Sequence, residues 1–158
     1  MSFGWGQEVE WSQIFGGTSD DEGWSIKQTL DGGYIAAGFT GSFGNGNYDL
    51  WLIKTDSNGN EEWNQTYGGS NNDLGISIEQ VSDGGYVVVG YTNSYGNGGF
   101  DFWLIKLDSN GNKEWDNTYG GDGDEFVNSF KETLDGGYII IGKSYSYAGL
   151  LLVKTDSN

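Results

Sequence analysis

The sequence predicts an all-β protein made of a repeated four-stranded unit, and three observations lead to this prediction. Tryptophan recurs at Trp11, Trp63 and Trp115, so that each step is 52 residues. The tetrapeptide Asp-Gly-Gly-Tyr recurs at the same step, beginning at residues 31, 83 and 135. Short stretches of β-branched and aromatic residues alternate with Gly-rich turns, which is typical of strands joined by hairpins. A fixed period of this length indicates a repeat architecture.

The repeat covers nearly the whole chain. Aligned without gaps, residues 16–67 and 68–119 are identical at 31 of 52 positions. The third unit, 120–158, is shorter and stops in the turn after its third strand. Residues 8–15 match an outer strand, although the three strands that should precede it are absent. We therefore divide the chain into a closing strand, 8–15, and three units, of which the last lacks its outer strand.

Four strands are expected in each unit, separated by Gly-rich or Asn-rich turns. The first strands are expected at 25–30, 76–81 and 128–133, the second at 34–40, 86–92 and 138–144, the third at 49–55, 101–107 and 150–155, and the outer ones at 61–67 and 113–119.

The second strands favour a β-propeller. They are apolar at consecutive positions, as in Val87, Val88 and Val89, which indicates a sheet covered on both faces. A radial stack of small sheets covers both faces of each one. Because propellers have about four to eight blades, three units are too few for one ring. We expect a six-bladed ring formed by a homodimer, in which residues 8–15 of each chain complete the third blade of the other. The alternative is a three-bladed ring or an open arc.

Composition excludes several classes of function. The net charge of −16 opposes binding to nucleic acid phosphates and to anionic membranes. The absence of His and Cys excludes disulfides, Cys/His zinc sites and a Ser-His-Asp triad. A pair of carboxylates could still hydrolyse a glycoside, but with 23 acidic residues such a pair is a weak signal. We therefore expect a protein that is not an enzyme, with glycoside hydrolysis as the enzymatic alternative.

No targeting or membrane segment is apparent. The chain has no apolar run of 18 residues, and Met1–Gln7 lacks the basic and apolar regions of a signal peptide.

The complete motif resembles a known kind of repeat. It consists of Gly-Gly-x-x-x-Asp-x-Gly-x-Ser-Ile-x-Gln, Asp-Gly-Gly-Tyr, Gly-Asn-Gly-x-x-Asp-x-Trp-Leu-Ile-Lys and Asp-Ser-Asn-Gly-Asn-x-x-Trp. It resembles the Gly/Asp-rich propeller repeats of archaeal and bacterial surface or secreted proteins and is similar in outline to Kelch and quinoprotein-type propellers. The resemblance implies an extracellular or cell-surface setting and an adhesive or scaffolding role. The third unit lacks Gly-Asn-Gly and the Asp and Trp of the third strand, and an engineered or excised repeat fragment would also fit the pattern.

Acidic residues at repeated loop positions are the first candidate site. Asp21, Asp73 and Glu125 are equivalent in the three units, and on a ring they would form a negative annulus able to bind a divalent cation such as Ca²⁺. The alternative is that each carboxylate braces its own loop through backbone amides. Asp49 and Asp101 open the third strands, where we expect the same bracing role.

Aromatic residues near the same loops are the second candidate site. Trp24, Tyr48 and Tyr95 lie beside Asn and Asp residues, the combination that stacks on sugar rings and binds their hydroxyl groups. The function expected is a non-catalytic binding or scaffolding module that assembles with itself. The alternatives are a lectin-like glycan binder and a calcium-binding surface module, and the partner is a glycan or a protein.

Overall fold

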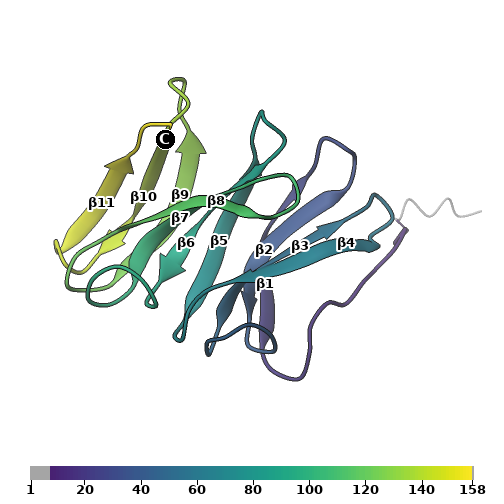
Figure 1. Cartoon of the computed structure of the whole chain (residues 1–158), viewed down its shortest axis with the longest axis horizontal. Coiled ribbons are helices and arrows are strands. Elements are labelled where there is room, and N and C mark those ends of the chain that lie inside the picture. Colours follow the sequence, from purple (N-terminus) through teal and green to yellow (C-terminus); the bar gives the residue numbers. More distant parts are fainter. Residues whose placement is uncertain (1–7, 158) are drawn as a thin grey trace, which may run out of the picture.

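The structure is a computed structural model that describes residues 8–157, so the expectation about Met1–Gln7 lies outside the described residues. Within this range the chain forms eleven antiparallel strands in three sheets, without a helix (Figure 1). None of these residues therefore belongs to a helix that is long and apolar enough to cross a membrane. The three sheets correspond to the three sequence units.

Each sheet is a meander in which neighbours in sequence are neighbours in space. Sheet 1 contains β1 (Asp21–Gln28), β2 (Tyr34–Thr40), β3 (Asp49–Thr55) and β4 (Glu61–Tyr67). Sheet 2 contains β5 (Asp73–Gln80), β6 (Tyr86–Thr92), β7 (Asp101–Leu107) and β8 (Lys113–Tyr119). Sheet 3 contains β9 (Glu125–Glu132), β10 (Tyr138–Ser144) and β11 (Gly149–Lys154).

The first strand of each unit begins earlier than the sequence predicts. In β1 the pairing with β2 extends back to Asp21, opposite Thr40, past a register shift between Gly23 and Ser25. The same shift occurs between Gly75 and Ser77 in β5. Such a bulge absorbs one extra residue, so the ladder continues beyond the point at which a regular hydrophobic pattern ends. The predicted second and outer strands of the units agree with the structure, and β11 begins and ends one residue early.

The turns between the first two strands follow the Asp-Gly-Gly-Tyr motif. Gly32 has a φ of 87°, a left-handed conformation that glycine adopts without steric cost. Asp31 accepts a hydrogen bond from the Gly33 amide at 2.9 Å and one from the Thr29 hydroxyl. The repeated motif therefore encodes a turn that is closed by its own carboxylate.

The sheets pack face to face in chain order (Figure 1), and the core lies between them. Between sheets 1 and 2 are Ile35, Ala37, Leu50, Leu52, Ile78, Tyr86, Val88, Trp103, Ile105 and Leu107. Between sheets 2 and 3 are Val81, Val87, Val89, Phe102, Leu104, Val127, Phe130, Tyr138 and Ile140. Sheet 2 is thus covered on both faces, and β1, β5 and β9 contact one another in succession. This arrangement is consistent with a propeller-like fold.

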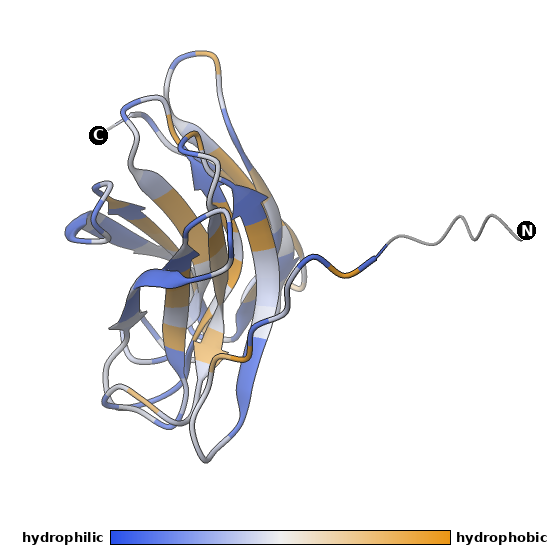
Figure 2. Cartoon of the chain, turned by 90° about the vertical axis from the view of Figure 1, so that its right-hand side faces the viewer, coloured by the Kyte–Doolittle hydropathy of each residue, from blue (hydrophilic) through white to orange (hydrophobic). Residues whose placement is uncertain are grey.

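Residues 8–15, expected to form an outer strand, form no strand in the single chain. A strand needs a neighbouring strand for its backbone hydrogen bonds, and within residues 8–157 this segment pairs with none. The segment instead runs beside sheet 1 (Figure 2).

Candidate functional site

The equivalent acids at the starts of β1, β5 and β9 are turned into their own loops. Asp73 is fully buried, and its Oδ2 accepts hydrogen bonds from the Gly69 amide at 2.8 Å and the Ser94 hydroxyl at 2.7 Å. Its Oδ1 accepts the Thr92 hydroxyl. Asp21 accepts the corresponding groups of Gly17, Ser42 and Thr40. Glu125 accepts the Gly121 amide, the Ser144 hydroxyl and the Ser146 amide.

These hydrogen bonds also decide the charge of the acids. Burial raises the pKa of Asp21 and of Glu125, but the hydrogen bonds from hydroxyl and amide groups outweigh it. Both pKa values therefore lie below the ordinary range, and both groups remain carboxylates. Within residues 8–157 no group of three or more acidic side chains converges as metal ligands would. The geometry of each acid is that of loop bracing, one of the two roles that we expected.

Asp49 and Asp101 lie beside these acids at the junctions between sheets. Asp49 accepts the amides of Asn45 at 2.9 Å and Gly46 at 2.8 Å. Asp101 accepts one amide, from Asn97 at 2.6 Å, while its buried Oδ1 has no partner among the described residues.

Two carboxylates crowd the backbone of Gly120. A Cβ at this position would lie 1.7 Å from Asp101 Oδ1 and 2.3 Å from Glu125 Oε2. Asp101 and Glu125 are both buried, so their mutual repulsion is weakly screened. Burial and the neighbouring Glu125 raise the pKa of Asp101 above its ordinary value. The junction between sheets 2 and 3 therefore contains a buried pair of like-charged groups.

Trp24 and Tyr95 are exposed but already engaged. The indole of Trp24 donates to Glu22 at 2.9 Å and lies edge-on to Phe39. The Tyr95 hydroxyl donates to the Gly68 carbonyl at 2.8 Å, so it holds the connection between sheets 1 and 2.

Tyr48 lines a polar cavity of about 570 Å³ where the loops of sheets 1 and 2 meet. A parallel bridge pairs Tyr48 with Asn72, and the Asp73 amide donates to the Tyr48 carbonyl at 2.7 Å. The other lining residues are Ser19, Asp20, Gly41, Asn47 and Asn72. Of the predicted site residues only Tyr48 lies in this cavity. The other residues that line the cavity were not predicted, because their types are not repeated at equivalent positions. The equivalents of Asn47 and Asn72, for example, are Gly99 and Asp124.

The N-terminal segment makes a contact that recurs at both sheet junctions. The ring of Trp11 lies 5.7 Å from that of Tyr34. In the outer strand β4, Trp63 lies 6.0 Å from Tyr86 of sheet 2, and in β8, Trp115 lies 6.2 Å from Tyr138 of sheet 3. Trp11 therefore occupies on sheet 1 the place that belongs to the outer strand of a preceding sheet.

The glycines beside these rings repeat the same relationship. A Cβ at Gly59 would meet the ring of Trp11, and one at Gly111 would meet the ring of Trp63.

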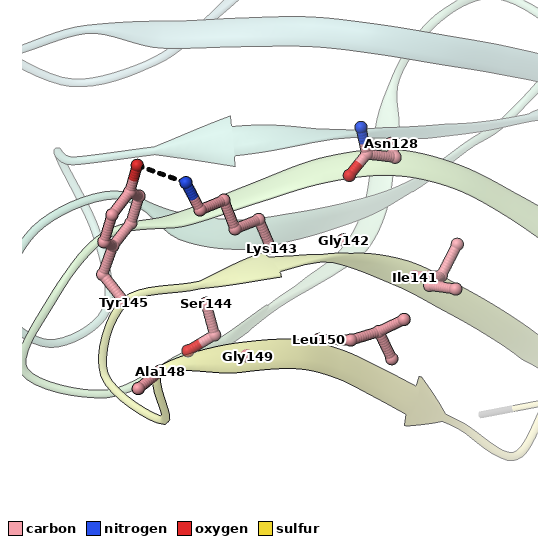
Figure 3. A pocket seen from close by; sticks show the side chains of 9 residues that line it. All are labelled: Asn128, Ile141, Gly142, Lys143, Ser144, Tyr145, Ala148, Gly149 and Leu150. Carbon is pink, nitrogen blue, oxygen red and sulfur yellow. Dashed lines mark hydrogen bonds between the residues drawn. The ribbon is translucent and has the colours of Figure 1, made fainter.

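Both ends of the stack leave apolar side chains uncovered. Ile26 of sheet 1 is 63% exposed, whereas its equivalent in sheet 2, Ile78, is fully buried. On sheet 3, Leu150 is 66% exposed, whereas its equivalent Phe102 is fully buried. A cavity of about 690 Å³ lies on this open face, between Ile141, Tyr145 and Leu150 among others (Figure 3). Each end face has the composition of a core without the neighbour that would cover it.

The lysines of the third strands differ between the units in their ion pairs and in their exposure. Lys54 pairs with Asp31 at 2.9 Å and Glu62 at 2.6 Å, and its side chain is 3% exposed. Lys106 pairs in the same way with Asp83 and Glu114. Lys154 pairs with Asp135 at 2.9 Å but is 42% exposed, because the outer strand that carries the second acid is absent from sheet 3.

No family model matches this chain, and no curated protein matches it either.

Proposed function

We propose that the chain is a non-catalytic binding and scaffolding module, and that two copies complete one six-bladed propeller. The observation that carries this proposal is the packing of Trp11 on Tyr34, which repeats the contact of an outer strand with the following sheet. Residues 8–15 are in position to serve as the outer strand of a sheet that lies next to sheet 1. Sheet 3 of a second copy is the sheet that lacks such a strand.

The repeat specifies the register of the proposed pairing. In sheets 1 and 2, Lys54 lies opposite Trp63 and Lys106 lies opposite Trp115. Lys154 would then lie opposite Trp11 of the second copy. The acid equivalent to Glu62 and Glu114 is Glu10. Glu10 of one copy would thus supply the second carboxylate to Lys154 of the other.

The apolar faces fit the same arrangement. In the single chain, a Cβ at Gly75 would lie 2.9 Å from Leu50 of the preceding sheet, whereas one at Gly23 would meet nothing within 4 Å. Leu150 is the counterpart of Leu50, so Leu150 of a second copy would fill the space beside Gly23.

The energetics are compatible with the same arrangement. Full burial of Ile26, Leu150 and Leu152 at both junctions would contribute up to about 9 to 18 kcal/mol, at about 1.5 to 3 kcal/mol for each side chain. This range is comparable with the roughly 4 to 15 kcal/mol that association costs. The pairing of residues 8–15 with β11 would add backbone hydrogen bonds and remove an exposed sheet edge.

The hydrogen bonds of the buried loop acids support a function without catalysis. Asp73 and Glu125 are buried, and each already holds a backbone amide and a hydroxyl group, so neither is free to activate water. The charge of −16 favours neutral or cationic partners over nucleic acids and anionic membranes.

Light scattering on a sizing column tests the proposal with the full chain. The expected mass is about twice 17.2 kDa. In Glu10→Lys and in Lys154→Glu, like charges would meet at both junctions, so each variant alone is expected to be monomeric. Mixing the two variants is expected to restore a dimer. The introduced lysine of one variant would then meet the introduced glutamate of the other at one junction, while the native Glu10 meets the native Lys154 at the second junction.

The charge reversal Glu132→Lys, on an exposed position of β9, is the control and should remain dimeric. A folded monomer of the native chain would overturn ring closure by a second copy. A series of growing oligomers would overturn it as well, because it would mean that the contacts propagate without closing.

A further inference from the structure

We infer that the polar cavity between the loops of sheets 1 and 2 binds a neutral sugar of a glycan. This inference rests on the proposed function only in that the chain is a binding module. It does not require the ring to close, because every residue of the cavity comes from one chain.

Asn72 differs from its equivalent Asp124 in the hydrogen bonding of its side-chain oxygen. At the junction of sheets 2 and 3, Asp124 Oδ1 accepts the Phe100 amide at 2.9 Å. At the junction of sheets 1 and 2, Asn72 Oδ1 is buried and accepts no hydrogen bond from the described residues. Since an unpaired buried acceptor costs about 1 to 3 kcal/mol, the site is suited to a donor from outside the protein.

Tyr48 differs from its equivalent Phe100 in the surroundings of its ring. Phe100 packs against Tyr91 at 5.2 Å and Phe126 at 5.7 Å, in an apolar aromatic cluster. Tyr48 is half-buried against Phe39 at 4.8 Å and lines the cavity.

Gly41 allows this position of the tyrosine. A Cβ at Gly41 would lie 3.1 Å from Cε1 of Tyr48, closer than ordinary van der Waals contact, so the absence of a side chain leaves room for the ring beside the backbone. The wall of the cavity therefore combines an aromatic ring, which lies against the Gly41 backbone, with polar groups.

The combination of groups points to the ligand class. Asp20 supplies an exposed carboxylate, its Oδ2 lying 3.5 Å from the Tyr48 hydroxyl, and Asn72 supplies the unpaired carbonyl. Both accept hydrogen bonds, as the hydroxyl groups of a sugar require. Asn47 and Ser19 add donors at the rim, and the tyrosine ring offers an apolar surface to sugar C–H groups. The net charge of −16 opposes acidic sugars, which leaves neutral ones.

The chain itself provides substitutions that its fold tolerates at the equivalent positions. Tyr48→Phe and Asn47→Gly install the residues of the second junction, and Asn72→Asp installs the residue that there accepts an amide. The full chain would be applied to an array of neutral glycans that end in glucose, galactose, mannose or N-acetylglucosamine. Affinity for the best glycan would then be measured by calorimetry.

Binding of a neutral glycan is expected, weakened at least tenfold by Asn72→Asp and by Tyr48→Phe combined with Asn47→Gly. The control Asp124→Asn, at the other junction, is expected to leave affinity unchanged. Retention of no neutral glycan by the folded chain would overturn the inference, as would affinity that is indifferent to the cavity variants. Binding of calcium ions alone, with no glycan, would overturn it too.

The same samples separate this inference from the proposed assembly. A dimer that binds no glycan rejects the sugar site and leaves the ring intact. A monomer that binds glycan through the cavity rejects the ring and leaves the site.

Discussion

Trp11 packs on Tyr34 with ring centroids 5.7 Å apart and reproduces, before the first sheet, the contact of Trp63 with Tyr86 between the first and second sheets. The ring planes are tilted by 58° in the first pair and 65° in the second. A segment that forms no strand in the single chain thus already has its tryptophan in the position of an outer strand.

Replacement of Trp11 by alanine is expected to weaken self-association more than it weakens the fold of one chain. Trp11 is 39% exposed in the single chain, and its indole would bridge the proposed junction. We expect the dimer dissociation constant to rise at least tenfold, which corresponds to about 1.4 kcal/mol or more. Sedimentation at a series of protein concentrations measures it.

Trp63→Ala is the matched control for that substitution. Trp63 packs between sheets of one chain, so its loss should lower the free energy of unfolding by about 3 to 5 kcal/mol. If Trp11→Ala lowered unfolding stability as much as Trp63→Ala while dimerisation was unchanged, the segment would belong to sheet 1 alone.

Asp101→Asn is expected to stabilise the protein. The new amide can donate to Glu125 while its oxygen still accepts the Asn97 amide, so a like-charged buried pair becomes a hydrogen-bonded pair. At pH 7 we expect a gain of about 1.5 to 3 kcal/mol in the free energy of unfolding, the scale of a hydrogen bond to a charged group. Urea unfolding measures this gain. Asp49→Asn should gain less, because Asp49 already accepts two amides.

The effect of Asp101→Asn should depend on pH. Because the pKa of Asp101 is raised in the folded chain, the native state holds its proton more tightly than the unfolded state does. The native chain should therefore lose stability as pH rises through that folded pKa, and it should be at full stability below the unfolded value of about 3.8. The advantage of the variant should shrink toward pH 4, and an advantage that is constant with pH would contradict the shared burial of the two acids.

Lys106→Ala should destabilise the chain more than Lys154→Ala. The Lys106 side chain is 9% exposed and pairs with two carboxylates, whereas that of Lys154 is 42% exposed. Because Asp83 and Glu114 are themselves about half exposed, solvent screens the pairs, and we expect a loss of about 1 to 3 kcal/mol rather than that of a fully buried pair. Thermal unfolding under dilute, monomeric conditions compares the two, and equal losses would contradict the difference in burial.

Asp31 should titrate at strongly acidic pH. The hydrogen bond from the Thr29 hydroxyl, the Gly33 amide and Lys54 together lower its pKa from 3.8 to about 2. Its contribution to stability should be complete above the unfolded value and lost as pH falls through about 2. Carbon NMR of the side-chain carboxyl follows this titration. In Thr29→Val the pKa should move up toward its ordinary value, and an unchanged pKa would mean that the hydroxyl plays no part.

Local features of the fold were predictable from the sequence because short-range chemistry decides them. The turn at Gly32 depends on residues within four positions of it. Consecutive apolar residues indicate the strands β2 and β6. The repeat at Trp11, Trp63 and Trp115 predicted that Trp11 belongs with the outer strands. The early start of β1 was not predictable, because the bulge after Gly23 becomes favourable only when β2 is paired beside it.

The features of the candidate site also fall into those that the sequence determined and those that only the tertiary structure decided. By itself the sequence determined the repeat, the acids at equivalent loop positions and the chemistry that the chain lacks, since these depend on residue type and spacing. The tertiary structure decided that Asp101 faces Glu125, that Tyr95 is engaged by Gly68, and that Asn72 lines a cavity with an unpaired oxygen. These relationships join residues from different loops, and only the folding of the strands and the packing of the sheets bring those residues close together.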